Sequence, residues 1–220
     1  MPANQDTTSF APGPGQLYDS RQRGIRKANK MTPAEREFAL HQLAESRQSL
    51  LRMAQGRSPE EWHYRAAPGR WTVAECVEHI VIVEKLLLER IQKTLEKNPD
   101  PSRRSALEGQ DHALVAIAVG RVDRWQAPEI LVPTGRWPLE QLLPEFESAR
   151  RLTQHFAVNS QADLRRHFFK HPALGDLDLY QWLILIPAHC DRHRIQSEEV
   201  ISHPQFPRAH QANARTQSSS

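Results

Sequence analysis

The feature that most limits the fold of this chain is a set of four long segments in which apolar residues recur at intervals of three and four. These segments begin near residues 32, 72, 138 and 178. Because an α-helix turns once every 3.6 residues, this spacing places the apolar side chains on one helical face. No alternation of apolar and polar residues competes with it. The sequence therefore predicts an all-α protein.

Three of the segments begin with a residue pair that caps a helix. Residues 32–35 read Thr-Pro-Ala-Glu, Thr72 is followed by Glu75, and Asp178 is followed by Gln181. In such a capping box the first side chain accepts from the backbone three residues on, and the second side chain reaches back. The same chemistry at residues 58–61 predicts a short helical turn, and Pro138 suits the first turn of the third long helix.

The segment at residues 99–137 has a polar stretch, an apolar run at 113–119 and prolines at 128 and 133. We predict that it is a long crossover between the second and third long helices and contains one short helix. A four-helix bundle accommodates such a connection. Further along, we expect a short helical piece at 161–169 and a loop at 171–175.

The 220 residues, of which 39% are hydrophobic, suffice for one core. We predict a disordered N-terminal tail at residues 1–30, a helical bundle domain at 31–202 and a disordered C-terminal tail at 203–220. The first tail is rich in Pro, Gly, Ser and Gln, and the second ends in three serines. Such compositions bury too little apolar surface to offset the entropy of ordering.

The positive charge of the chain lies in these tails. Residues 1–30 hold five Lys/Arg against two Asp, and residues 203–220 hold two Arg and no acid, whereas the whole chain carries a net charge of +3. The middle is therefore slightly acidic. No aromatic residue is interleaved with the basic residues of the tails to stack on bases, so we expect no nucleic-acid binding.

The chain shows no feature of an exported or membrane protein. No stretch approaches the ~20 apolar residues that cross a bilayer, and Cys76 and Cys190 are too few for a disulfide framework. We expect a cytoplasmic protein with both cysteines reduced and no membrane partner.

Two histidines, His189 and His193, lie four residues apart within the apolar stripe of the last segment. Residues four apart share a helical face, so both imidazoles can reach one metal ion at ~2.0 to 2.1 Å. The alternative is a pair of hydrogen-bonded core histidines. Cys190 stands where a zinc protease of the HExxH type has its glutamate base, which argues against that class.

The natural third ligand is His79, which flanks the apolar stripe of the second segment beside Cys76 and Val83. Facing helices of a bundle commonly supply the side chains of a metal site. Three neutral imidazoles would leave positions open for water or substrate. A histidine at the edge of the core is the alternative for His79.

Two motifs resemble those of the DinB/YfiT-like family. Residues 68–80, PGRWTVAECVEHI, resemble its W-S/T-x-x-E-x-x-x-H signature, and residues 188–196, AHCDRHRIQ, resemble its H-x-x-R-H-x-x-Q motif. The resemblance implies a four-helix bundle, often a homodimer, with a three-histidine metal site at His79, His189 and His193. Known members include S-transferases that use low-molecular-weight thiols, isomerase-like relatives and proposed hydrolases.

The predicted function is therefore binding of a divalent metal ion, zinc or nickel by preference, that activates a low-molecular-weight thiol or water to attack a small-molecule substrate. S-transfer is favoured slightly over hydrolysis. The alternatives are a non-catalytic, metal-stapled binding or stress-response module, and nucleic-acid binding through the basic tails. The sequence contains no Ser-His-Asp set, phosphate-binding Gly-rich loop or dinucleotide fingerprint.

Several further residues lie near the histidines in sequence. Gln196 is one turn beyond His193 and could orient a bound ligand or water. We interpret Glu75 as a helix cap, and Asp191 and Arg192 as solvated helix charges. We interpret Cys76 and Cys190 as small core residues rather than ligands. The residues considered and set aside as catalytic groups are Glu75, Glu78, Asp191 and Arg192.

Overall fold

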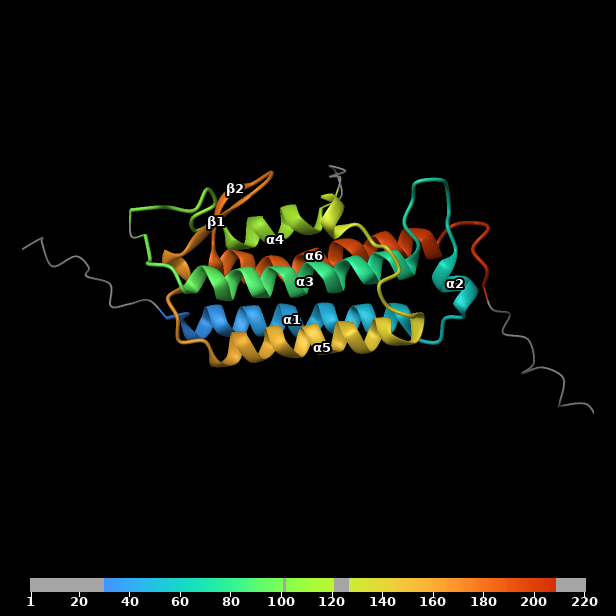
Figure 1. Ribbon diagram of the computed structural model, residues 1–220, viewed down its shortest axis with the longest axis horizontal. Coiled ribbons are helices and arrows are strands. Elements are labelled where there is room, and N and C mark those ends of the chain that lie inside the picture. The colour runs from blue at the N-terminus through green and yellow to red at the C-terminus, as the bar shows by residue number, and fades with distance from the viewer. Residues whose placement is uncertain (1–29, 101, 121–126, 209–220) are drawn as a thin grey trace, which may run out of the picture.

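The long helices begin where the capping residues place them. The computed structural model of the protein (Figure 1) describes residues 30–100, 102–120 and 127–208. Helices α1 (Pro33–Ala54), α3 (Val73–Leu95) and α6 (Leu179–Ile201) each start with a complete capping box, as does the short α2 (Pro59–His63). Helix α5 (Leu139–Asn159) starts after Pro138 and continues through Pro144. Most of each predicted tail lies outside the described residues.

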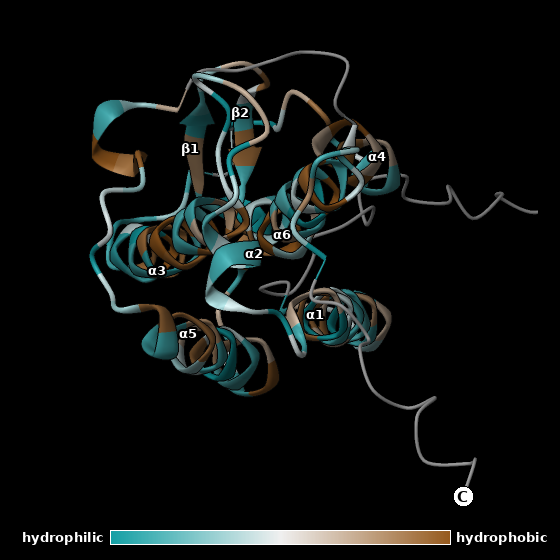
Figure 2. Cartoon of the chain, turned by 90° about the vertical axis from the view of Figure 1, so that its right-hand side faces the viewer, coloured by the Kyte–Doolittle hydropathy of each residue, from teal (hydrophilic) through white to brown (hydrophobic). Residues whose placement is uncertain are grey.

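The four long helices lie side by side in two pairs. Helix α1 packs against α5 and α6, and α3 packs against the same two helices. Seen end-on, α3 and α6 form the middle of the molecule and α1 and α5 lie beneath them (Figure 2). The prediction of an all-α protein is confirmed in its coarser form, since the described residues are mostly helical.

The crossover contains the predicted short helix, α4 (Asp111–Val119), which packs on the side of α6 away from α1 and α5. Leu114 and Ala118 are its buried residues. A short 3-10 turn, η2 (Glu129–Leu131), follows and contacts α3. The crossover thereby brings a loop to the first turns of α3.

The structure departs from an all-α fold at a small hairpin. Strands β1 (Phe168–His171) and β2 (Gly175–Asp178) pair antiparallel. The helical piece expected at 161–169 is reduced to a 3-10 turn, η3 (Leu164–Arg166). Phe169 and Leu177 face each other across the ladder and form the one residue pair of the hairpin in which both side chains are buried. Four-residue strands are too short to show a clear period of two. The sequence pattern therefore could not reveal them.

Helix α6 is the centre of the molecule. All residues from Leu179 to Ala188 are buried, because α1, α3, α4 and the hairpin cover the helix. A helix that is apolar on every side is expected in a core. The continuous buried stretch ends at His189, which is half-buried. The last half of α6 is thus where polar side chains come near the core.

Ionic contacts join the ends of several elements. Arg165 of η3 bonds to Glu35 of α1, Asp111 of α4 and Asp178 at the start of α6. At the other end, Tyr64 contacts residues that follow α6: its hydroxyl lies 2.6 Å from Nδ1 of His203, and Phe206 is buried. The first residues of the predicted C-terminal tail therefore pack on the domain, while its exact boundaries stay a prediction.

Within the described residues, no helix is both long enough and apolar enough to cross a membrane.

Candidate metal centre

The structure brings His79, His189 and His193 together. One ligand atom from each of the three lies within 4.8 Å of the other two, and they are the group of His, Cys, Asp or Glu side chains in the described residues that could hold a metal ion. Nε2 of His79 lies 3.2 Å from Nε2 of His189. The ring centroids are 4.5 Å apart for His79 and His193 and for His189 and His193.

The helices α3 and α6 produce this convergence. They pack along each other. Each begins with a capping box and continues with buried apolar residues along its length, and both features favour a long helix. His189 and His193 are one turn apart on α6, and the helix continues through Pro187. His79 and His193 are buried, whereas His189 is half-buried. His189 is therefore the most exposed of the three residues.

The second ring nitrogen of two of these histidines has an oxygen partner. Nδ1 of His79 lies 2.8 Å from the carbonyl of Leu131, and Nδ1 of His193 lies 3.0 Å from Oε1 of Gln196. A carbonyl can only accept, so Nδ1 of His79 carries the proton and its Nε2 presents a lone pair. The bond to Gln196 Oε1 favours the same tautomer in His193. Lone pairs thus point into the cluster.

Burial lowers the pKa of His79. The pKa of His189 is lowered further below the ordinary histidine value, first by burial and then by the neighbouring imidazoles of His193 and His79. Both rings are therefore neutral near pH 7. Neutral imidazole is the form that ligates metals.

An indole forms part of the wall around the imidazoles. The Trp71 ring is 4.8 Å from the His79 ring and 5.7 Å from the His193 ring. Trp71 precedes the N-cap of α3, so the same turn that starts the helix places this ring. The sequence patterns gave Trp71 no site role beyond its place in the motif, and they could not identify the Leu131 carbonyl, which is a backbone atom.

The other charged residues near the histidines have separate partners. Glu75 closes the capping box of α3 and pairs with Arg65. Asp191 pairs with Arg194, and Arg192 bonds to the carbonyl of Gly120 after α4. Gln196 contacts the cluster through His193, as a support for a ligand would.

Both cysteines are buried and free of disulfides. Cys190 lies near Ser46, with its sulfur 3.9 Å from the Ser46 carbonyl. Burial is the largest effect on this thiol and raises its pKa to about 12. Cys190 is therefore a protonated thiol near pH 7, which agrees with its interpretation as a core residue.

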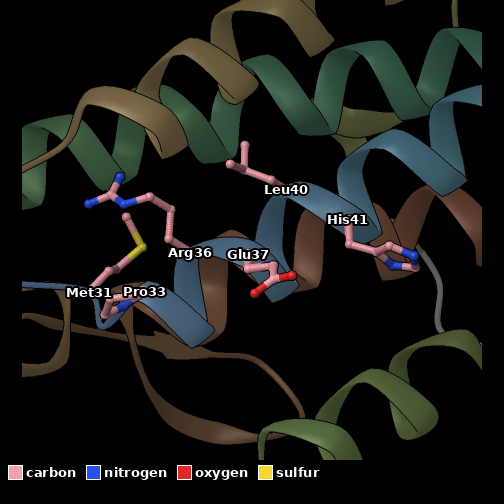
Figure 3. Close-up of a pocket in the computed structure, with 6 residues that line it drawn as sticks. All are labelled: Met31, Pro33, Arg36, Glu37, Leu40 and His41. Atoms are coloured by element: carbon pink, nitrogen blue, oxygen red, sulfur yellow. The ribbon is translucent and has the colours of Figure 1, made fainter.

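A separate hollow lies on α1, with a volume of about 650 Å³ (Figure 3). Its lining side chains point in different directions along the helix, and Arg36 is bonded to the carbonyls of Val158 and Ser160. None of the three histidines lines it. The lining residues are Met31, Pro33, Arg36, Glu37, Leu40 and His41. A shallow hollow without convergent polar atoms does not make a binding site.

Comparison with known proteins identifies the family of the chain. The model of the DinB superfamily matches residues 42–197, so the chain belongs to the DinB superfamily. A relative is the uncharacterized protein YuaE of Bacillus subtilis strain 168, which is 24% identical over 155 residues, 66% of this chain and 86% of the relative. No solved structure matches the chain.

Proposed function

We propose that the protein binds one divalent metal ion through His79, His189 and His193 and is a metal-dependent enzyme. The observation that carries the proposal is the convergence of three imidazoles from two helices, two of which turn their Nε2 lone pairs inward. Without a cation, these two lone pairs would share at most one donor, the Nε2–H of His189, and a buried acceptor without a partner is costly. We also propose that the four long helices form one four-helix bundle and that residues 99–137 are the crossover between its second and third helices.

The donor set fits such an ion. Two nitrogens that are each ~2.1 Å from a tetrahedral ion lie roughly 3.4 Å apart, and the Nε2 atoms of His79 and His189 are 3.2 Å apart. Imidazole suits zinc and nickel, and we propose these as the resident metals. The superfamily membership of the chain supports the same site.

When bound, a divalent ion supplies Lewis acidity, which lowers the pKa of a thiol or of water enough to make a nucleophile near neutral pH. The residues of the chain would hold the ion and orient the imidazole rings that bind it. Leu131 and Gln196 hold two of the rings. We propose that a small molecule approaches from the side of His189, the most exposed of the three residues. We propose a low-molecular-weight thiol as the cosubstrate, with S-transfer favoured over hydrolysis.

Elemental analysis of untagged protein tests the metal site. We expect a stoichiometric divalent ion in the wild type and loss of that ion in His79→Ala, His189→Ala and His193→Ala. Wild-type protein that remains empty after dialysis against zinc and nickel salts would refute the proposal.

Turnover tests the reaction. Purified protein is incubated with bacillithiol, mycothiol, glutathione or coenzyme A and a model electrophile, with and without a chelator. Chelator-sensitive loss of the electrophile that requires a thiol supports S-transfer, and loss without any thiol supports hydrolysis.

A second candidate is a module in which the metal only ties α3 to α6. The observation in its favour is that Glu75 and Glu78, the carboxylates nearest to His79 in sequence, are both bonded to backbone amides. They are therefore poorly placed to act as a general base. Under this reading, metal raises the melting temperature but no thiol or electrophile shifts it further.

A further inference from the structure

Glu78, the residue that precedes His79, has a buried carboxylate. Glu78 is 3% exposed, and in the described residues it has no ion-pair partner. Instead, its oxygens accept from three successive backbone amides: Thr134 at 2.9 Å, Gly135 at 2.9 Å and Arg136 at 3.1 Å. A buried carboxylate is costly unless such bonds compensate it. For Glu78, the compensating hydrogen bonds come from the backbone of one loop, residues 134–136.

The loop is shaped for this contact. Residues 134–136 are exposed on their outer side, and Gly135 has a φ of +74°, in the left-handed region. Nothing lies within 4 Å of where a Cβ of residue 135 would be. Glycine is therefore required for the backbone conformation rather than for space. That conformation aims three consecutive amides at one carboxylate.

The same loop supplies the carbonyl that holds His79. Leu131, three residues before Thr134, accepts from Nδ1 of His79 at 2.8 Å, and the Arg136 side chain bonds back to the carbonyl of Ile130 at 2.9 Å. Two adjacent residues of α3 thus bind two points of one loop. Glu78 fixes its far end and His79 contacts its near end.

We propose that Glu78 is a positioning residue for the metal ligand His79. By holding residues 134–136, Glu78 keeps the Leu131 carbonyl against Nδ1, which selects the tautomer whose Nε2 lone pair faces His189 and His193. This role rests on the proposed metal site, but the arrangement of loop and ring is a property of the metal-free chain. The outer partner of a ligating histidine typically changes metal affinity by about 10- to 100-fold.

The main test compares Glu78→Gln with Glu61→Gln. Glu61 is the control, because it is also a buried carboxylate that accepts a backbone amide, that of Ser58. Its other partner is Arg57, at 3.7 Å, and none of these bonds involves the three histidines or the loop that holds His79. We expect Glu78→Gln to weaken zinc binding by about 10- to 100-fold in competition with a chromophoric chelator. Glu61→Gln should bind zinc like the wild type.

A second readout needs no metal. In the chelator-treated, ¹⁵N-labelled protein, the ring nitrogens of His79 should report a proton on Nδ1 in the wild type and a mixture of tautomers in Glu78→Gln. If the wild type binds no ion, the proposed function fails while this comparison still decides the role of Glu78. Wild-type tautomer and wild-type zinc affinity in Glu78→Gln would overturn the positioning role even if the metal site stands.

A variant on the loop side guards against a Glu78 variant that does not fold. Gly135→Ala disfavours the left-handed conformation without a clash, and Gly135→Asn tolerates it better. We expect Ala to weaken zinc binding and to mix the His79 tautomers, and Asn to recover part of both. Equal zinc affinities in all three proteins would overturn the proposal.

Discussion

Two buried polar clusters, both in contact with helix α6, satisfy their polar groups in opposite ways. The ionic core cluster consists of Arg150, Glu84 and Ser46, and the imidazole cluster consists of His79, His189 and His193. His189 belongs to the second cluster, and its neighbour Cys190 reaches toward Ser46 of the first. Adjacent helical residues point about 100° apart, so α6 contacts both.

The ionic core cluster is complete in itself. Both nitrogens of a fork on Arg150 bond to Glu84 at 2.9 Å, and the remaining one bonds to Ser46 and to the Leu43 carbonyl at 2.6 Å. The imidazole cluster is not balanced in this way, because Nε2 of His79 and Nε2 of His193 both carry lone pairs, and His189, whose Nε2 lies 3.2 Å from that of His79, can donate at most one hydrogen to them. The comparison teaches that an internally balanced cluster supports the scaffold, whereas a cluster short of positive charge calls for a ligand.

The largest effect on stability should follow from breaking the ionic core cluster. Arg150→Met leaves the carboxylate of Glu84, which is 1% exposed, without its cation. Removing one partner of a buried ion pair costs about 3–5 kcal/mol of unfolding free energy. Urea denaturation of the metal-free protein measures this loss, and the double variant Arg150→Met/Glu84→Leu should regain much of it.

The matched control is the exposed pair Arg104–Glu108, whose side chains are both 64% exposed. Arg104→Met should change the unfolding free energy by less than about 1 kcal/mol. A loss from Arg150→Met no larger than that of the control would mean that the ionic core cluster does not support the fold.

The next largest effect concerns the imidazole cluster. His189→Ala should lower zinc affinity by more than about 100-fold, beyond what loss of an outer partner does. At pH 8 it should lower the stability of the metal-free protein less than the loss of a histidine with two oxygen partners does, because only the contact with Nε2 of His79 is lost. Chelator competition and urea denaturation measure the two quantities.

His167 offers a contrasting histidine for this experiment. It is buried, and both its ring nitrogens bond to carbonyls, those of Asp163 and Lys97. His167→Ala should therefore destabilise the protein and leave zinc affinity intact. Equal effects of the two substitutions on stability and on affinity would erase the distinction between structural and ligand histidines.

The sequence predicted the long helices and the shared face of His189 and His193 from local rules, whereas His79 was added through the family resemblance and the packing of helices in a bundle. The structure brings the three side chains together, and their role as metal ligands stays a prediction. Capping boxes and apolar spacing placed α1, α3 and α6 within a residue or two. The i, i+4 spacing placed His189 and His193 on one face. The long-range partners were beyond such rules: Arg150 bonds to Ser46 and Glu84 across about a hundred and about seventy residues, and Glu78 meets a loop over fifty residues away.

The hairpin and the outer shell of the site were missed for related reasons. The strands β1 and β2 have four residues each, which is too few to display a period. The acceptor of His79 is the Leu131 carbonyl, and every residue has a carbonyl, so no residue type marks it. Backbone partners become visible only when the chain is folded.

Acid should weaken the metal-free protein in the region of the imidazole cluster. Burial lowers the pKa values of His79 and His189 in the folded state, and the unfolded value is about 6.5. The unfolded chain then binds more protons below that pH. The stabilising contribution is therefore present above about pH 6.5 and is lost as the pH falls toward the lowered values.

Urea denaturation between pH 8 and pH 5 in the presence of a chelator measures this dependence. His189→Ala should flatten the acid side of the profile, because the histidine with the more strongly lowered pKa is removed. Identical profiles for the two proteins would show that His189 is not held neutral by the fold.

The smallest effect should come from the side chain that supports His193. Gln196 accepts from Nδ1 of His193 at 3.0 Å, so Gln196→Ala should lower zinc affinity by about tenfold, or about 1.4 kcal/mol. Gln196→Glu keeps an acceptor and should retain the affinity, because a carboxylate also orients the ring and increases its basicity. Stability of the metal-free protein should change little in either variant, since Gln196 is only partly buried. If Ala and Glu at this position bind zinc equally, the bond to His193 does not tune the ligand, and the imidazole cluster is oriented by its helices and by the Leu131 loop.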